Sequence, residues 1–467
     1  MNLKNILSAL LLLCCFQGIF GQSVLATHTL ELKKTRDYHE ITAAPEANNR
    51  GLTVFAADKN VVTALRYTRV LYYADSLAAE RPDTNEYDLI AGYSYNTEGQ
   101  PSAYWASSDY KKIQEVHFDF EAKTVTDYFY ELPFKDEDIL TSFSENNAFY
   151  IVTLPKLGSK LKLYIFNQGK YVQRTLDFSK FSFTNPDNKA TSFNRLLDSY
   201  PLQKIDKGTY TPLPATVSKI KFYVTNNAIV LSLNQNPAFT QLFTIDASTY
   251  AITENIIPQI IVKDADANSF LHEQKLYQVV LNRDEIVLSR TNLDSVQDTK
   301  TLRAGAEDTI AFKNSPLLEQ TDNKRDSEFK NTKRFLRRAD GGSAAVSVYQ
   351  TPNDLLVVTG AIRYVVPAEN VAMGVAVMAA AGIDPYEMYP SNTQSVYFES
   401  LFDDEFNHKP LPQQRLAADY IGQFMSQNER NIALQSVFKY DYYYVLGYYD
   451  ARAKKYVLVK FQDDFVN

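Results

Sequence analysis

The sequence is poor in cysteine and glycine. Cys14 and Cys15 are its only cysteines, and both lie in an apolar run near the N-terminus. Once that run is removed, the chain has neither a disulfide nor a thiolate for catalysis or metal binding, so packing must stabilise it. Glycine contributes 16 of 467 residues, about half the usual share, so many turns must use Asn, Asp or Pro.

Motifs for common catalytic chemistries are also missing. The sequence has no Gly-x-Ser-x-Gly elbow, no Gly-x-x-x-x-Gly-Lys loop and no His-Glu-x-x-His zinc motif. We therefore assign no catalytic residue, metal site or cofactor, and leave the ligand-binding residues unassigned. The five histidines are far apart, which does not favour a zinc site: His28, His39, His117, His272 and His408.

One segment partly resembles a calcium loop. Asp264, Asp266 and Asn268 place oxygen ligands at the first, third and fifth positions. The sixth position is Ser269 instead of glycine, and the twelfth is Lys275 instead of the bidentate glutamate. An acidic surface turn is the simpler interpretation.

The N-terminus has the order of a secretory signal. Lys4 precedes the apolar run 6–20, and Gly21 follows it. We predict a signal peptide over residues 1–21, cleavage after Gly21, and a secreted or periplasmic protein. Lipid anchoring through Cys14 or Cys15 is the alternative, but a leucine precedes Cys14 and apolar residues continue after Cys15.

No later segment is long enough to span a membrane. The apolar run 371–383 has 13 residues, whereas a spanning helix needs about 20. We interpret it as a buried hairpin or helix.

Aromatic residues are plentiful, with 32 tyrosines and 28 phenylalanines, and they favour β-strands. Between residues 138 and 179, short β-rich runs alternate with turn residues such as the pair Asn146 and Asn147, which predicts a four-stranded meander. In it, residues 148–154 should be covered on both faces, and residues 160–166 should lie nearer solvent. Similar units recur around Asn227, Asp284, Asp354 and Asp441.

These units predict an all-β fold, an irregular β-propeller of about six or seven blades over residues 22–467. We expect residues 29–34 to close the ring by pairing with residues 456–461. The spacing of the units exceeds the roughly 40 to 50 residues of a propeller blade. We therefore place insertions at about 304–340 and 366–427, with a helix over 412–427. Two β-sandwich domains divided near 304–340 are the alternative.

Three surface candidates each have a simpler interpretation. Tyr104 and Trp105 could stack on a sugar, but core packing is favoured. The basic run 324–338 holds seven basic and two acidic side chains, and a solvated loop explains it. The acidic run 403–405 is interpreted in the same way. The formal net charge of −7 also argues against a nucleic-acid partner.

These features favour an exported, non-catalytic binding or scaffolding protein that recognises a protein or glycan through loop surfaces. The alternative is a secreted carbohydrate-active hydrolase or lyase that uses paired carboxylates. Oligomeric state and ligand identity are left open.

Overall fold

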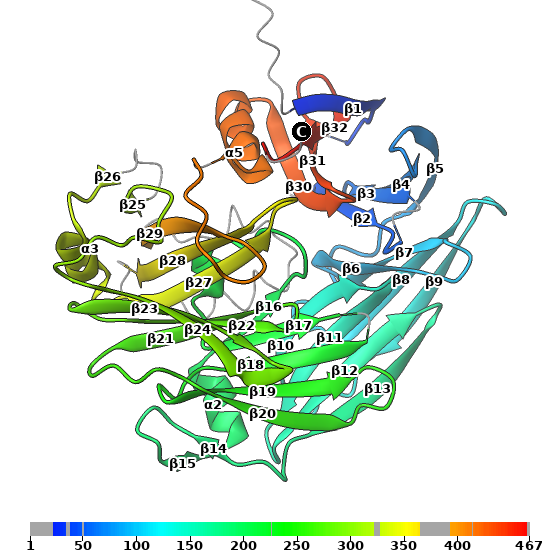
Figure 1. Cartoon of the computed structure of the whole chain (residues 1–467). Helices are drawn as coiled ribbons and strands as arrows, with labels where there is room; N and C mark the ends of the chain where they lie inside the picture. The colour runs from blue at the N-terminus through cyan, green and yellow to red at the C-terminus, as the bar shows by residue number, and fades with distance from the viewer. Residues whose placement is uncertain are drawn as a thin grey trace, which may run out of the picture.

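The computed structural model describes residues 22–33, 38–48, 51–225, 227–321, 327–364, 393–412 and 414–464. In this part of the chain, seven sheets of four or five strands are accompanied by one two-stranded ribbon. The sheets follow one another in sequence order around the molecule (Figure 1). The predicted signal peptide with Cys14 and Cys15 and the apolar run 371–383 lie outside the described residues.

We call each of the seven sheets of four or five strands a blade. Four blades are regular antiparallel meanders whose strands are hydrogen-bonded in chain order. Blade 1 contains β2 (Glu40–Pro45), β3 (Gly51–Ala57), β4 (Val61–Thr68) and β5 (Tyr73–Glu80). Blade 2 contains β6 (Leu89–Tyr95), β7 (Pro101–Ala106), β8 (Lys112–Asp119) and β9 (Thr124–Glu131). Blade 3 contains β10 (Glu137–Glu145), β11 (Ala148–Pro155), β12 (Lys160–Asn167) and β13 (Lys170–Asp177). Blade 5 contains β21 (Asp266–His272), β22 (Lys275–Leu281), β23 (Glu285–Asn292) and β24 (Ser295–Gly305).

The other three blades recruit a strand from outside the simple meander. Blade 4 has β17 (Ile220–Val224), β18 (Ala228–Leu233), β19 (Phe239–Asp246) and β20 (Ile252–Pro258), with β16 (Leu202–Ile205) parallel to β17. Blade 6 has β27 (Ser343–Gln350), β28 (Leu355–Tyr364), β29 (Thr393–Phe402), β25 (Leu318–Thr321) and β26 (Ser327–Glu328). Blade 7 has β30 (Ile432–Tyr440), β31 (Tyr443–Asp450) and β32 (Lys455–Phe461), completed by β1 (Gln22–Thr29).

The meander predicted over residues 138–179 is confirmed as blade 3, including the burial of both faces of β11. The expectation that one face of β12 lies near solvent is wrong. Leu161 and Leu163 pack toward blade 4, while Tyr164 and Phe166, on the opposite face, pack toward blade 2. Side chains alternate across a strand, so a blade between two others buries both sets.

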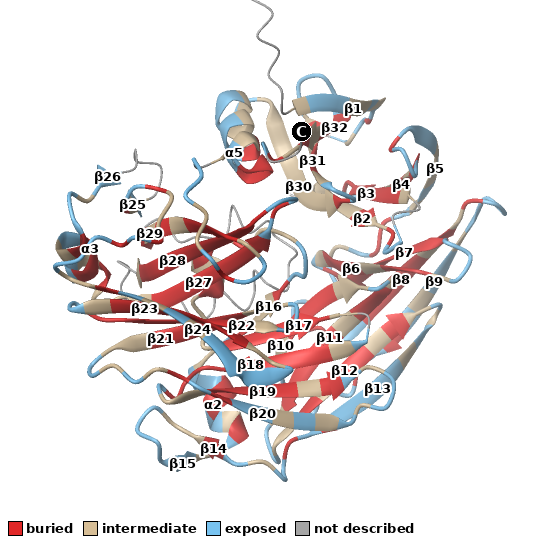
Figure 2. Ribbon diagram, viewed as in Figure 1, coloured by how far each residue is buried: buried red, intermediate tan, exposed pale blue. Residues whose placement is uncertain are grey.

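Shared hydrophobic clusters join each blade to the next and close the ring. Trp105 belongs to the cluster between blades 1 and 2, and Phe149 to that between blades 2 and 3. Further clusters join blades 3 and 4, blades 4 to 6, and blades 6 and 7. The last cluster joins blade 7 to blade 1 and includes Tyr67 and Tyr456. Buried residues accordingly form red bands through the sheets (Figure 2). The fold is therefore a seven-bladed β-propeller, and the two-sandwich alternative is wrong.

The ring is closed by pairing between the two ends of the described chain. β1 pairs antiparallel with β32, from Gln22 opposite Phe461 to Thr29 opposite Lys455. The predicted C-terminal partner is therefore confirmed. The predicted N-terminal segment, residues 29–34, is wrong by several positions, because Leu30 to Lys33 form no strand. These residues connect blade 7 to blade 1, and the Lys33 amide donates to Asp58 at 3.0 Å.

The connection from β16 to β17, residues 206–219, lies inside the ring and contacts three other blades. It includes the 3-10 helix η2 (Leu213–Thr216). The Tyr444 hydroxyl of blade 7 accepts from the Tyr210 amide at 2.7 Å. Ser347 of blade 6 donates to the Thr211 carbonyl, and Asn268 of blade 5 donates to the Val217 carbonyl at 2.9 Å. Part of the interior of the ring is thus filled by the chain itself.

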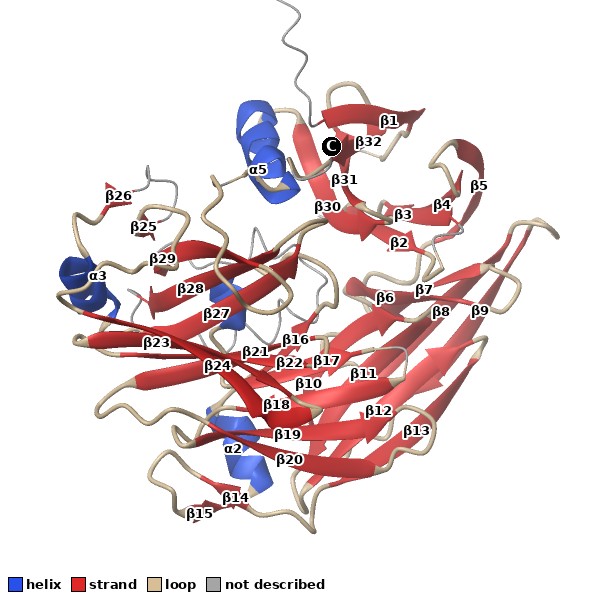
Figure 3. Cartoon of the chain, in the orientation of Figure 1, coloured by secondary structure: helices blue, strands red, loops and turns tan. Residues whose placement is uncertain are grey.

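Helices and small elements account for the irregular spacing of the blades. The described residues include three short α-helices (Figure 3): α2 (Phe193–Ser199), α3 (Thr332–Ala339) and α5 (Ala417–Asn428). The ribbon of β14 (Phe183–Thr184) and β15 (Ala190–Thr191) lies before α2. The helix predicted over 412–427 corresponds to α5, which buries Ile421 against blades 6 and 7. The predicted insertion 304–340 supplies β25 and α3 to blade 6. Among the described helices, none is long and apolar enough to cross a membrane.

Deleting β1 should destabilise the whole ring. A chain of residues 30–467 loses the seven paired positions between β1 and β32 and uncovers the edge of blade 7. At roughly 1 kcal/mol for each hydrogen bond, we expect the free energy of unfolding to fall by about 3 kcal/mol or more. Urea denaturation of chains 22–467 and 30–467 measures this. Equal unfolding free energies would show that the ring does not depend on this strand.

Candidate functional site

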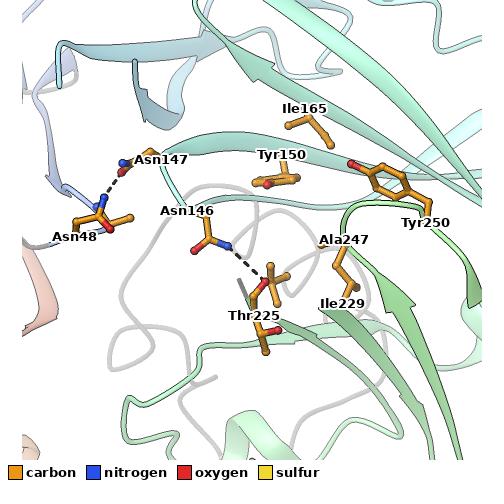
Figure 4. A pocket seen from close by; sticks show the side chains of 11 residues that line it. Asn48, Asn146, Asn147, Tyr150, Ile165, Thr225, Ile229, Ala247 and Tyr250 are labelled. Carbon is orange, nitrogen blue, oxygen red and sulfur yellow. Dashed lines mark hydrogen bonds between the residues drawn. The ribbon is translucent and has the colours of Figure 1, made fainter. Parts of the chain in front are cut away.

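A cavity of about 380 Å³ lies among turns of blades 1, 3 and 4. Successive strands of a meander run in opposite directions, so the turns after the first and third strands reach the same face. The cavity is built from such turns and from the strand residues beside them (Figure 4). Its lining consists of Ala47, Asn48, Asn146, Asn147, Tyr150, Ile165, Val224, Thr225, Ile229, Ala247 and Tyr250.

The β10–β11 turn forms one wall. Asn146 and Asn147 both have a left-handed backbone, with φ of 49° and 62°, and asparagine tolerates this conformation better than most residues. The Asn147 side chain accepts from the Ala47 amide at 2.8 Å and donates to the buried Glu46 carboxylate at 2.6 Å. The turn predicted from this asparagine pair is confirmed. It also holds the first turn of blade 1 in place.

The β19–β20 turn of blade 4 forms the opposite wall. Asp246 accepts hydrogen bonds from the amides and hydroxyls of Ser248 and Thr249, and these bonds hold its pKa well below the usual range. The turn ends at Tyr250, whose backbone is left-handed with φ of 59°. Such a conformation is uncommon for a bulky side chain. It brings the Tyr250 ring to the cavity, where the hydroxyl points toward the space beside Tyr150 (Figure 4).

Two other blades contain the same turn without the tyrosine. Asp119 in blade 2 and Asp450 in blade 7 each accept from the second and third following amides, as Asp246 does. The fourth following residue is also left-handed there, but it is Lys123 or Lys454. The backbone geometry is therefore a repeated structural device. The aromatic side chain at its end distinguishes blade 4.

Tyr150 is fixed by packing on one side. Its ring stacks on Phe143 with centroids 5.0 Å apart. Burial is the main cause that raises the pKa of Tyr150 to about 12, followed by the neighbouring Tyr250 and Glu145. The hydroxyl therefore remains a hydrogen-bond donor throughout the physiological range. Figure 4 shows Tyr150 and Tyr250 facing the same space, with Ile165 and Ile229 beside them.

The calcium-like segment supports a seam between blades 4 and 5. Asp266 forms an ion pair with Lys219 at 2.7 Å and accepts from the Ala344 amide. Asn268 accepts from the buried Lys221 amine at 2.6 Å. Burial, and secondarily the nearby Lys219, lower the pKa of Lys221 well below its usual value. Asp266 and Asn268, two of the three residues that resemble calcium ligands, are thus already bonded to lysines.

The histidines do not converge on one another. No group of three His, Cys, Asp or Glu side chains suited to a metal occurs among the described residues. His28 stacks on Tyr73, His117 contacts the Ser102 hydroxyl, and His408 contacts the Asn314 side chain. His39 contacts the Lys33 carbonyl, and burial lowers the pKa of His272.

The remaining surface candidates have structural roles. Tyr104 and Trp105 are fully buried, so the core interpretation is confirmed. Asp403 accepts amide hydrogen bonds from Glu405 and Asn407 and so closes its own turn. The described part of the basic run, residues 327–338, forms β26 and α3, where Arg338 pairs with Glu319 at 2.6 Å. Residues 324–326 lie outside the described residues.

Sequence reasoning identified parts of this site as turns but did not identify the site. Asn146 and Asn147 carry a hairpin signal, whereas no local pattern in the sequence marks Tyr150, Thr225 or Tyr250. The signal that could reveal the cavity is the residue at the left-handed end of the turn. It is Tyr250 in blade 4 and a lysine in the equivalent turns of blades 2 and 7. Only a correct alignment of the blades reveals that difference.

The ring of seven blades places the chain in the class of β-propellers. The chain matches no family model and no curated protein. It is similar to the β-propeller domain of Vanderwaltozyma polyspora Nup133, with a TM-score of 0.36, 10% identity, and coverage of 96% of this chain and 99% of that one. A cobalt-substituted apocarotenoid oxygenase from Synechocystis gives a TM-score of 0.29 at 7% identity, covering 58% of this chain and 62% of that one. A prolyl endopeptidase structure gives a TM-score of 0.30 at 8% identity, covering 70% of this chain and 42% of that one.

Replacing Asn147 with glycine should destabilise the fold. Glycine keeps the left-handed backbone but loses the side-chain bonds to Ala47 and Glu46. A charge-assisted bond of this kind contributes roughly 2 kcal/mol, and we expect a comparable drop in unfolding free energy by urea denaturation. The matched control is Asn146→Gly, which removes only a 3.5 Å contact to Thr225. Equal losses in the two variants would refute this role of Asn147.

Proposed function

We propose that this protein is an exported, non-catalytic binding protein that holds its ligand in the cavity among blades 1, 3 and 4. One observation carries the proposal: a preformed cavity whose described lining residues include tyrosine, asparagine and threonine but no carboxylate, histidine, lysine or arginine. A volume of about 380 Å³ falls in the range of small-ligand sites, roughly 300 to 1,000 Å³. The hydrogen bonds that hold the β10–β11 and β19–β20 turns support a binding role, because walls formed before binding reduce the cost of ordering.

The hydrolase or lyase alternative would need two carboxylates standing about 5 to 10 Å apart across a cleft. None of the described residues that line this cavity supplies one. Glu46, Glu145 and Asp246 each precede a lining residue in the sequence. Glu46 is buried and accepts from Asn48 and Asn147, Glu145 pairs with Lys204, and Asp246 accepts from amides of its own turn. This cavity therefore favours recognition over glycosidic bond cleavage.

Filling the cavity should abolish binding. Ala247 follows Asp246 and lines the cavity, so Ala247→Trp should occupy it. We expect at least one ligand class in a panel of neutral sugars, acidic and amino sugars, amino acids and short peptides to raise the melting temperature of residues 22–467. Thermal denaturation of wild type and Ala247→Trp measures this, and the variant should lose the rise.

The matched control is Ala451→Trp, an exposed position that follows Asp450 in the equivalent turn of blade 7. It should retain the full ligand-induced rise. A wild-type protein that responds to no class, or a rise that survives in Ala247→Trp, would contradict the proposed site.

Export is supported by the position of the closing strand. Cleavage after Gly21 would leave β1 complete, because its pairing with β32 begins at Gln22. We expect the full chain, expressed with a C-terminal tag in a Gram-negative host, to be recovered outside the cytoplasm with Gln22 as its first residue, by intact-mass spectrometry. The double variant Cys14→Ser/Cys15→Ser should behave identically. An acylated N-terminal cysteine, or a retained leader, would overturn this prediction.

A further inference from the structure

The chemistry of the cavity restricts the kind of ligand that it can hold. Charged ligands are disfavoured, because the lining residues that the structure describes offer no ionised partner and an unpaired charge in a cavity loses its hydration. A purely apolar ligand is also disfavoured. It would cover the Tyr150 and Tyr250 hydroxyls and the Asn146 amide without replacing their hydrogen bonds to water.

The polar groups of the lining are available to a ligand. Within the described part of the chain, the Tyr150 and Tyr250 hydroxyls make no hydrogen bond to another residue, and the Asn146 side chain makes only a long one, at 3.5 Å to the Thr225 carbonyl. Each hydroxyl can donate and accept, and each amide offers both an acceptor and donors. A ligand with several hydroxyl groups matches this set, because each of its hydroxyls can donate to an acceptor of the lining or accept from a donor.

The lining also has an apolar and aromatic part. Ile165, Val224 and Ile229 lie beside the two tyrosines. The Tyr150 ring is held by stacking on Phe143, and the Tyr250 ring lies under the Arg174 guanidinium at 5.3 Å. Both rings are thus supported from the protein side before any ligand arrives. Such aromatic and aliphatic surfaces suit the C–H face of a sugar ring, while the hydroxyl and amide groups suit its polar edge.

A peptide fits the cavity less well. Peptides are commonly recognised by pairing with an open strand edge or by charged groups that hold a terminus or an ionised side chain. This cavity is lined by turns and by residues of the internal strands β11, β12, β17 and β18, and none of its described lining residues is charged. Neither mode of peptide recognition is available there.

We infer that the ligand of this cavity is a neutral saccharide, one or two sugar rings in size, held by the Tyr150 and Tyr250 hydroxyls and the Asn146 amide. This inference rests on the proposed function, because it specifies the ligand class of the same site. The position of Tyr250 supports it independently. The equivalent turns of blades 2 and 7 end in lysine, whereas only the copy at the cavity presents an aromatic hydroxyl.

Calorimetric titration of residues 22–467 with neutral hexoses, N-acetylhexosamines and their disaccharides tests the inference. We expect saturable binding of at least one neutral sugar. The corresponding uronic acid and amino sugar should bind at least tenfold more weakly. Affinity should be constant between pH 5 and pH 9, because no acidic, basic or histidine side chain occurs among the described lining residues and the pKa of Tyr150 is about 12.

Removing single hydroxyls localises the binding. Tyr150→Phe preserves the stacking on Phe143 and removes only the oxygen, so affinity for the sugar should fall about tenfold. Tyr250→Lys gives the turn the last residue that the equivalent turns of blades 2 and 7 have. It should abolish the binding without loss of stability. Tyr442→Phe, an exposed position at 57% of its full accessibility in blade 7, should change affinity less than twofold.

The outcomes separate this inference from the proposed function. Binding of a peptide or a charged ligand, and of no neutral sugar, with loss of that binding in Ala247→Trp, would overturn the saccharide inference and leave the cavity as the binding site. If the variants Ala247→Trp and Tyr250→Lys both retained sugar binding, the saccharide inference and the proposed binding site would be overturned together. Unchanged sugar affinity in Tyr150→Phe would overturn the assigned role of its hydroxyl.

Discussion

The structure depends on burying both faces of every blade against its neighbours. A single four-stranded sheet with aromatic and aliphatic side chains on both faces cannot be stable alone in water, and a row of such sheets would leave two apolar faces at its ends. Closure of the ring removes those ends. The cluster that includes Tyr67 and Tyr456 covers the last two faces, and the pairing of β1 with β32 holds the two chain ends together.

This constraint also explains where variation is tolerated. The sheets must match their neighbours, whereas the turns at their ends only need to reverse the chain. The turn with an aspartate cap and a left-handed fourth residue is used in blades 2, 4 and 7. In blade 4 its last residue became part of a cavity wall, and that change requires no adjustment of the sheets. A binding site can therefore be built on this scaffold from ordinary turn residues.

Much of the fold could be predicted, because the strand and turn signals are local. The asparagine pair at 146–147 predicts a hairpin for a physical reason, and the structure has that hairpin. The errors arise where the deciding contact is distant in sequence. Tyr164 looked solvent-facing because the alternation of lysine and leucine in β12 suggests one wet face, but blade 2 covers it. The sequence predicts residues 304–340 as an insertion, whereas their short strand β25 belongs to blade 6 and finds its partner, β29, only after some 70 further residues of chain.

The β-rich class, the positions of most hairpins and the need for several mutually packed sheets follow from the amino-acid sequence, since they depend on side-chain alternation and turn chemistry within a few residues. The number of blades, the segment that closes the ring and the cavity depend on contacts between residues far apart in the chain. Ala47, Tyr150 and Tyr250 are separated by about a hundred residues each, and none carries a local mark of function. Their common site exists only because ring closure brings the same ends of three different blades to one face.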